Sequence, residues 1–364
     1  MEFDSQQLCQ RLLLIGDAGW PRSPEPVLLS LRDTAHEELD KTRIIFLGDN
    51  VYLNGMPPEA GKERSAAEGR LNRQLEAVSD SGAKGVFIPG NHEWRKSSYK
   101  SAAPDFAVRP KAEAKFIHAR LGGGADFRPQ PGCLGPDYID LPGVRLIIFD
   151  SALLIDRLAT PDPALAKDAT GANPASFFQS LSELLRTGGD RKVIVLAHHP
   201  PATHGQHGGF YDFRDHIFPL TRLPQTHWLW APLPVIGSLY PAVRLAKNDP
   251  ENLSSPAYQE MNKKLLSAFR AKPPLFYAAG HEHNLQILTG SKAGSYILVS
   301  GAGSKTMLTT ATHGTDTIFS HLHTGFMALD FMRNGDVLLR VIEPADKEGH
   351  SIVAFSKWFK GHRG

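Results

Sequence analysis

Five short polar motifs contain most of the side chains that could do chemistry in this 364-residue sequence. Each follows an apolar run typical of a buried strand, at 12–15, 43–47, 85–89, 192–197 and 275–279. Because strand ends in a layered α/β domain converge on one crevice, we expect the motifs to meet there. They would bring together Asp17, Asp49, Tyr52, Asn91, His198, His281 and His283, which is the ligand set of a two-metal hydrolytic site.

The residue types in these motifs favour metal binding. Carboxylate oxygens and imidazole nitrogens bind hard and borderline cations. Two cations about 3.5–4 Å apart need a bridging ligand, and Asp49 is our candidate because Tyr52 lies on the same turn. His281 and His283 are separated by one residue, so each can reach a different cation. Glycine precedes the ligand in four motifs, which suits sharp turns and close backbone approach. Each motif alone is an ordinary turn, but five in order favour a site.

Over about residues 12–343 the motifs resemble those of the calcineurin-like metallophosphoesterase superfamily. The GDxxY form at 48–52, with GDxG at 16–19 and VxxHxP at 195–200, is similar to the purple acid phosphatase subgroup. The resemblance implies that Asp17, Asp49, Tyr52 and His283 bind Fe(III). It implies that Asp49, Asn91, His198 and His281 bind a divalent Fe, Zn or Mn, and that His92 lies near the substrate as general acid or transition-state stabiliser. The alternative for Tyr52 is an aromatic packed beside the site.

Two cations in such a site define a reaction. They would lower the pKa of a bound water, orient a phosphoryl group and neutralise charge during in-line displacement, so a metal-bound hydroxide would attack phosphorus. We therefore expect a phosphatase acting on a small-molecule phosphoester. The alternative is a phosphodiesterase or a lipid-phosphate hydrolase at a membrane surface. A non-catalytic scaffold would show broken ligand positions, and none is broken here.

Several further polar residues lie close to the motifs in sequence. Asn91 and His199 are candidate substrate contacts, and His199 could also support a ligand from behind. His204 and His207 fit either phosphate contact or a solvated glycine-rich loop. Arg95 fits either a phosphate contact or, more simply, an exposed arginine.

Composition restricts the class of protein. A hydrophobic content of 41% and a charged content of 21% are typical of a soluble globular chain. A net charge of +2 gives no indication of a nucleic-acid partner, and two cysteines give no disulfide framework. No signal sequence or membrane span is visible, so we expect a cytoplasmic or peripheral membrane protein, or a secreted or periplasmic one if a signal was removed. The oligomeric state stays open.

Alternating elements favour a layered α/β fold. Helices are expected at 25–39, 63–78, 111–121 and 176–185. Strands at 326–331 and 337–343 flank Asn334-Gly335, a hairpin signal, and strands after the last motif suit a second sheet facing the first. We therefore predict a four-layer αββα sandwich of two mixed sheets over residues 1–345, with an insertion at about 205–255 and a tail at 346–364.

Two segments have unusual compositions. Residues 218–247 contain prolines and Trp228, Trp230 and Tyr240 but no acidic residue. They fit a lid that contacts a lipid surface or, preferably, a segment packed on the core or on a second subunit. The basic, apolar stretch at 351–364 is expected to form a helix, docked on the domain or lying on a membrane.

Overall fold

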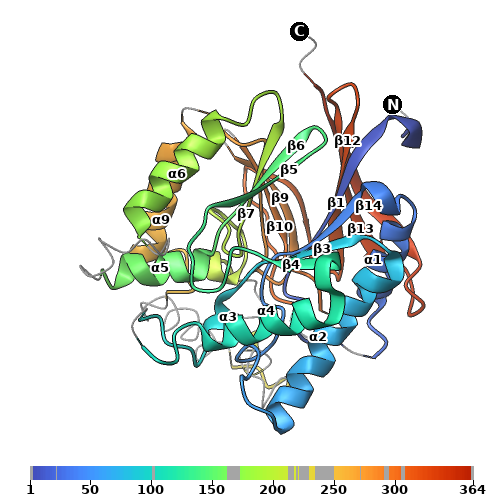
Figure 1. Ribbon diagram of the computed structural model, residues 1–364. Helices are drawn as coiled ribbons and strands as arrows, with labels where there is room; N and C mark the ends of the chain where they lie inside the picture. The colour runs from blue at the N-terminus through green and yellow to red at the C-terminus, as the bar shows by residue number, and fades with distance from the viewer. Residues whose placement is uncertain are drawn as a thin grey trace.

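The computed structural model describes residues 3–21, 23–100, 103–161, 173–211, 217–218, 220, 229–233, 250–270, 272–290, 295–304 and 308–361. Two mixed sheets of seven strands face each other, with helices on both outer faces (Figure 1). This four-layer α/β arrangement confirms the predicted fold class.

The first sheet has the strand order β14-β13-β12-β1-β2-β3-β4. Strands β1 to β4 run parallel, and β12 lies antiparallel to β1. Its bounds are β1 Leu8–Ile15, β2 Thr42–Phe46, β3 Lys84–Phe87, β4 Ala125–Phe127, β12 Phe326–Met332, β13 Val337–Pro344 and β14 Ser351–Phe359.

The second sheet has the order β11-β9-β10-β8-β7-β6-β5, with β6, β7, β8 and β10 parallel. Its bounds are β5 Asp137–Leu141, β6 Val144–Ile148, β7 Lys192–Leu196, β8 Phe276–Ala279, β9 Leu285–Gly290, β10 Ser295–Ser300 and β11 Thr317–His321.

The helices divide between the two outer faces. Helices α1, α2 and α4 pack on the first sheet, and α5, α6 and α9 pack on the second, on opposite sides in Figure 1. Their bounds are α1 Pro26–His36, α2 Lys62–Ser81, α3 Asn91–Trp94, α4 Val108–Leu121, α5 Ser151–Ala159, α6 Pro174–Arg186 and α9 Pro256–Phe269; short 3-10 helices lie at Ser5–Gln7, Leu39–Lys41, Gly122–Gly124 and Gln206–Gly208. The predicted helix at 25–39 ends three residues early, where the chain turns toward the 3-10 helix before β2.

Alternation along β1 shows why both faces of the sheet are buried. Leu12 and Leu14 point into the core between the sheets, whereas Leu13 and Ile15 point into the core beneath the helices. Successive strand side chains face opposite ways. A strand buried on both faces therefore reads as a continuous apolar run, which is how β1 appears in the sequence.

Two predictions about the C-terminal part are wrong. The hairpin of β12 and β13 joins the first sheet beside β1, whereas β9 to β11 belong to the second. The expected tail helix is strand β14, which pairs antiparallel with β13. The spacing of Ile352, Phe355 and Phe359 fits a helix face as well as an edge strand, and only pairing with distant β13 decides between them.

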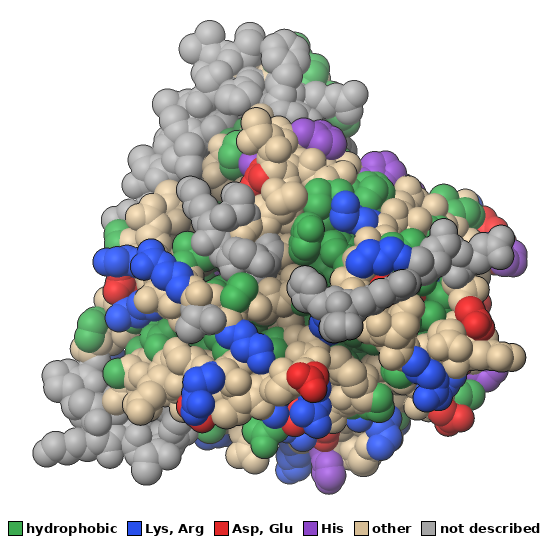
Figure 2. All heavy atoms as spheres, turned by 90° about the horizontal axis from the view of Figure 1, so that it is seen from above, with side chains coloured by type: hydrophobic (Ala, Val, Ile, Leu, Met, Phe, Trp, Pro, Cys, Tyr) green, Lys and Arg blue, Asp and Glu red, His purple; other side chains and the backbone are tan. Residues whose placement is uncertain are grey.

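The insertion lies largely outside the described residues. Trp228 and Tyr240 fall there, so their predicted contact with lipid or protein stays a prediction. Within the described part, Trp230 is 60% exposed, and its ring lies 5.4 Å from that of Phe218. None of the described helices combines the length and apolar character that crossing a bilayer requires. The face seen in Figure 2 carries Lys and Arg side chains interspersed with Asp and Glu.

Candidate metal centre

The carboxyl ends of β1, β2, β3, β7 and β8 carry the five motifs, as the sequence predicts. Hydrogen bonds join the two sheets there: Gly16 N donates to Ser300 O, and His198 Nδ1 contacts Leu47 O at 2.8 Å. Asp17 and Asp49 lie in the first sheet's turns, and His281 lies in the second's. Ligand candidates from both sheets therefore share one edge of the sandwich.

The turns adopt backbone conformations that constrain the ligand residues themselves. Asp17, Asp49 and His281 have φ values of 58°, 55° and 69°. Such left-handed conformations are uncommon outside glycine and gather at functional sites. Gly48 is left-handed as well, and a Cβ there would lie 2.6 Å from His198 Nδ1. A Cβ on Gly90 would collide with the Asp49 carboxylate. Glycine thus provides close approach, while the ligand residues supply most of the sharp turning.

Three side chains form what we call the first group: Asp17, Tyr52 and His283. Tyr52 Oη donates to Asp17 Oδ1 at 2.8 Å and lies 3.1 Å from His283 Nε2, which is 3.2 Å from the same Asp17 oxygen. Burial and the nearby Asp17 and Asp49 carboxylates raise the pKa of Tyr52 well above its usual value. Burial lowers the pKa of His283, but Asp17, Asp49 and Glu282 together outweigh it and the net shift is upward.

Three others form the second group: Asn91, His198 and His281. Asn91 Oδ1 lies 3.0 Å from His198 Nε2 and 3.2 Å from His281 Nδ1. The opposite ring nitrogens face carbonyls, because His198 Nδ1 contacts Leu47 O and His281 Nε2 contacts Glu251 O at 2.8 Å. A carbonyl only accepts, so these nitrogens carry the protons. Such bonds fix the tautomer that leaves the other nitrogen as a metal ligand.

Asp49 lies between the two groups. Its Oδ1 is 3.5 Å from His198 Nε2, and ligand atoms of Asp17, Asp49 and His198 all lie within 4.8 Å of one another. Burial raises the pKa of Asp49, but His198 and His92 outweigh it and hold the pKa well below its usual value. Burial likewise lowers the pKa of His198, yet Asp49 raises it to about 10. A proton on His198 then stands where a cation would bind.

The donor set fits cations. Burial lowers the pKa of His281 to about 4, so its ring is neutral at pH 7 and its Nδ1 presents a lone pair. That lone pair faces Asn91 Oδ1, whose amide nitrogen is occupied as a donor to Glu251 Oε1 at 2.9 Å. Protonated His198 can donate from Nε2 to Asn91 Oδ1, but the buried lone pair of His281 Nδ1 still faces that oxygen with no proton between them, which is costly unless something positive lies there. A cation among Asn91, His198 and His281 would satisfy both.

Two carboxylates, on buried Glu93 and half-buried Glu251, support the candidate ligands and received no role from the sequence. Glu93 accepts backbone N–H groups of Asp49, Val51 and Gly90 at 2.9, 3.1 and 2.7 Å, which joins the second and third motifs. Glu93 lies inside the third motif, so its position in the sequence could have indicated a supporting role. Glu251, in contrast, lies far along the chain from Asn91, and no local pattern indicates their contact.

Helices α2 and α4 hold the second motif from behind. Arg70 donates to Tyr52 O and Gln74 Nε2 donates to Asn50 O at 2.7 Å. From α4, Arg109 donates to Asn54 O at 2.8 Å, and Glu113 Oε1 accepts from Asn50 Nδ2 at 3.0 Å. Both pairs are spaced i,i+4, so each shares one helix face. We call these four residues the helix framework.

The predicted catalytic histidine borders the centre. His92 Nε2 lies 3.7 Å from Asp49 Oδ2, and Nδ1 contacts Leu53 O at 2.6 Å. Its ring packs edge-on against Tyr52 with centroids 4.3 Å apart. Burial lowers the pKa of His92.

The other candidate substrate contacts separate into near and far residues. The rings of His199 and His207 pack on His281 with centroids 4.3 and 4.1 Å apart. His199 Nδ1 also contacts Ser151 Oγ at 2.8 Å. His204 instead pairs with Asp316 at 2.6 Å. Arg95 is 40% exposed at its side chain and pairs with Glu251 at 2.9 Å.

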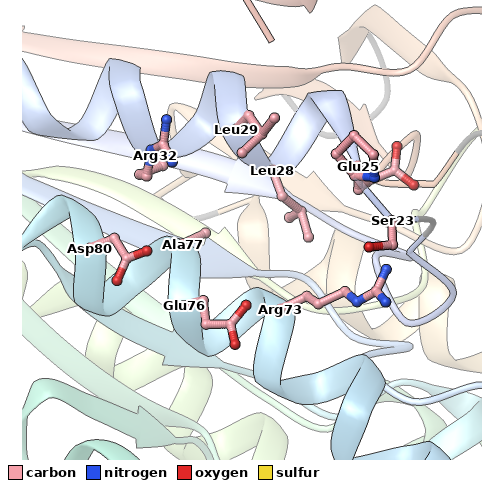
Figure 3. Close-up of a pocket in the computed structure, with 10 residues that line it drawn as sticks. Ser23, Glu25, Leu28, Leu29, Arg32, Arg73, Glu76, Ala77 and Asp80 are labelled. Atoms are coloured by element: carbon pink, nitrogen blue, oxygen red, sulfur yellow. The ribbon is translucent and has the colours of Figure 1, made fainter. Parts of the chain in front are cut away.

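A pocket of about 260 Å³ opens beside the second group, and Asn91, His199 and Glu251 line it. Another, of about 180 Å³, lies between α1 and α2 and contains none of the motif residues. Figure 3 shows its charged side chains in a groove of mixed sign: Glu25 at the start of α1 and Arg32 on it, and Arg73, Glu76 and Asp80 on α2. The pocket beside Asn91 is therefore the one that bears on chemistry.

The family model for calcineurin-like phosphoesterases matches residues 10–226. A purple acid phosphatase from yellow lupin (Lupinus luteus) seeds, PPD1, is similar in structure, with 15% identity and a TM-score of 0.58 over 99% of this chain and 55% of the lupin chain. GAP50, described as the anchor in the inner membrane complex of Plasmodium, is similar with 14% identity and a TM-score of 0.55 over 98% of this chain and 90% of its own. No curated protein is significantly similar in sequence. At these identities the two structures support the fold alone.

Proposed function

Because the chain belongs to the calcineurin-like phosphoesterase family, we propose that it is a phosphatase that hydrolyses small phosphomonoesters at a two-metal centre. The observation that carries the proposal is the pair of ligand groups with Asp49 between them. GAP50, the anchor in the inner membrane complex of Plasmodium, has a similar fold, so the fold alone does not distinguish a catalyst from a scaffold. The case for catalysis therefore rests on the polar side chains of the site.

The two groups differ in chemistry, and so should their cations. Asp17, Tyr52 and His283, with Asp49, would hold Fe(III), since a phenol with a raised pKa loses its proton most readily to a highly charged ion. Asn91, His198 and His281, with Asp49, would hold a divalent Fe, Zn or Mn. When bound, the cations supply an activated water and neutralise charge on the phosphoryl group.

The chain's own residues perform the remaining tasks. His92 donates Nδ1–H to Leu53 O and presents Nε2 beside Asp49. In its imidazolium form it can pass the Nε2 proton to the leaving oxygen as the bond from phosphorus to that oxygen breaks, which leaves a neutral imidazole. His199 and His207 pack around His281 and restrict water in that part of the site. His204 is occupied by Asp316, so we assign it no contact with phosphate.

Replacing the shared ligand is the direct test. Asp49→Asn should remove bound metal and lower kcat/KM for an aryl phosphomonoester by about 10³-fold or more, equal to about 4 kcal/mol of transition-state stabilisation. Asp126→Asn, at an exposed carboxylate on β4, is the matched control. Elemental analysis and hydrolysis of the same preparations give both readouts. Full activity in metal-bearing Asp49→Asn protein would reject the shared role.

The range of substrates needs a separate measurement. An aryl monoester, an aryl diester and a lysophospholipid can be compared at equal metal content. The proposal expects the monoester to react fastest. Preference for the lysophospholipid would instead favour the lipid-directed alternative and a substrate role for residues 218–247.

A further inference from the structure

Glu251 lies near the end of the predicted insertion, in the short described segment that leads into α9. Hydrogen bonds hold this segment in place. Ser255 caps α9 by accepting from Tyr258 N, and Leu253 N donates to His207 O at 2.9 Å. The Glu251 side chain is 24% exposed. Its carboxylate therefore approaches the second group from an anchored backbone.

Two hydrogen bonds connect Glu251 to the second group. Asn91 Nδ2 donates to Glu251 Oε1 at 2.9 Å, and His281 Nε2 donates to the backbone oxygen of Glu251 at 2.8 Å. The backbone bond keeps the proton of His281 on Nε2, which leaves a lone pair on Nδ1. The side-chain bond holds the NH2 end of the Asn91 amide away from the centre. One residue thus acts on two candidate ligands.

The neighbours of Asn91 inside the centre do not decide which end of its amide faces inward. His198 Nε2 and His281 Nδ1 lie 3.0 and 3.2 Å from Asn91 Oδ1. A protonated His198 Nε2 favours the amide oxygen at this place, because it can donate to that oxygen. The lone pair of His281 Nδ1 favours the NH2 group instead, because that group is a donor. In the metal-free protein these two preferences oppose each other.

Glu251 decides between the two orientations of the amide. An ionised carboxylate only accepts, so it binds the NH2 group of Asn91 and repels the amide oxygen. Arg95 Nη2 donates to the same Oε1 of Glu251 at 2.9 Å, which holds that acceptor in place. Cations bind the oxygen of an asparagine amide and not its nitrogen. The orientation that Glu251 selects is therefore the one in which Asn91 can be a ligand.

We infer that Glu251 is a positioning residue that turns the Asn91 oxygen toward the second cation position before a cation binds. The inference rests on the proposed function for the presence of that cation, but the role itself concerns metal binding rather than turnover. It also gives the end of the insertion a task in the centre that does not depend on contact with lipid.

The test is a titration of the metal-free protein with Zn²⁺ in competition with a chelator. Glu251→Met keeps the side-chain length but removes the acceptor. It should lower the affinity for one of two Zn²⁺ ions by about 10- to 100-fold, the usual effect of losing the partner behind a metal ligand. Glu251→Gln should retain most of the affinity, because Arg95 directs its amide oxygen to the same place. Glu183→Met removes an arginine-paired carboxylate from exposed α6 and is the matched control.

A double-mutant cycle with Asn91→Asp separates positioning from a general structural or electrostatic role. Aspartate presents an oxygen at either end, so its orientation does not matter. In that background Glu251→Met should change the Zn²⁺ affinity by less than about 2-fold, or raise it because two carboxylates no longer repel each other. Thermal unfolding of the same preparations shows that each variant is folded, and Glu251→Ala provides the same cycle if the methionine variant does not fold.

Three results would overturn the inference: no loss of affinity in Glu251→Met, equal losses in the methionine and glutamine variants, or equal losses with Asn91 and with Asp at that position. The phosphatase proposal fails separately. If the cycle behaves as expected but no phosphoester is hydrolysed, that proposal is wrong and the positioning role stands. If the aryl monoester is hydrolysed but Glu251→Met binds Zn²⁺ as the wild type does, the positioning role is wrong and the phosphatase proposal stands.

Discussion

The two ligand groups of the metal centre differ in how their polar atoms are satisfied without a cation. In the first group, Tyr52 donates to Asp17 and faces His283, so a proton stands between acceptors. In the second group, Asn91 Oδ1 and His281 Nδ1 are both acceptors and lie 3.2 Å apart. A proton therefore joins the facing atoms of Tyr52 and Asp17 in the first group, whereas none joins the facing atoms of Asn91 and His281 in the second.

This difference indicates which position depends more on its cation. A cation entering the first group must displace the phenol proton, whose pKa is raised well above its usual value by burial and by Asp17 and Asp49. A cation entering the second group displaces only the proton on His198 and removes the repulsion between two lone pairs. We therefore expect cation binding to be more favourable in free energy at the second group than at the first.

Between the two groups, the largest expected difference comes from removing one candidate ligand of each. His281→Ala should lower kcat by about 10²–10³-fold, comparable with the loss of one transition-state contact. Tyr52→Phe keeps the ring and should lower kcat by about 10-fold or less. Any visible Fe(III)–phenolate band should disappear. Turnover, absorption spectra and metal content measured on both variants give the comparison. A smaller loss for His281→Ala than for Tyr52→Phe would reverse our ranking.

A smaller effect should follow from weakening the helix framework on the first group's side. Gln74→Leu removes the donor to Asn50 O and leaves a buried carbonyl unsatisfied, which costs about 1–3 kcal/mol of unfolding free energy. Because Asn50 follows Asp49, metal affinity should fall about 10-fold. Urea unfolding and metal titration measure the two losses. Gln179→Leu, at an exposed position of α6, is the control. An equal loss of stability and metal affinity in that variant would show that Gln74 has no special role.

The smallest expected effect is a change in how the stability of the fold depends on pH. Burial, then the charge of Glu93, raise the pKa of Glu113 well above its usual value. The folded protein keeps this proton while the unfolded chain releases it above about pH 4.5, so stability falls as pH rises from there toward the folded pKa. Glu113→Gln should weaken this dependence of stability on pH. The stability of the variant relative to wild type should therefore be greatest at alkaline pH. Unfolding midpoints between pH 5 and pH 9 provide the test, and parallel curves would contradict it.

Sequence predicts much of this candidate centre because its candidate ligands follow strands. The five apolar runs match β1, β2, β3, β7 and β8 closely, and the shared edge follows from parallel strands. Contacts between residues far apart in the sequence cannot be predicted in this way. Glu251 supports Asn91 and His281 from a distant segment. Gln74 and Glu113 sit on helices whose polar faces read as solvated, yet both are fully buried against the second motif.

The C-terminal strand illustrates the same limit for fold. Its residues fit two periodicities over a short length, and the choice depends on the paired backbone of β13. Local pattern decides between helix and strand poorly when an edge strand carries apolar residues on both faces. The placement of β12 beside β1 is likewise set by pairing between the two ends of the chain.

The presence of ligands from both sheets has a consequence for folding equilibria. Any cation bound jointly by Asp49 and His198 binds the closed sandwich and not the unfolded chain, so it adds to the free energy of unfolding by mass action. At a free concentration of 100 times Kd the addition is about 2.7 kcal/mol. Metal supply would then set how much of this protein persists folded as well as how fast it works, and a chelator would act as a mild denaturant.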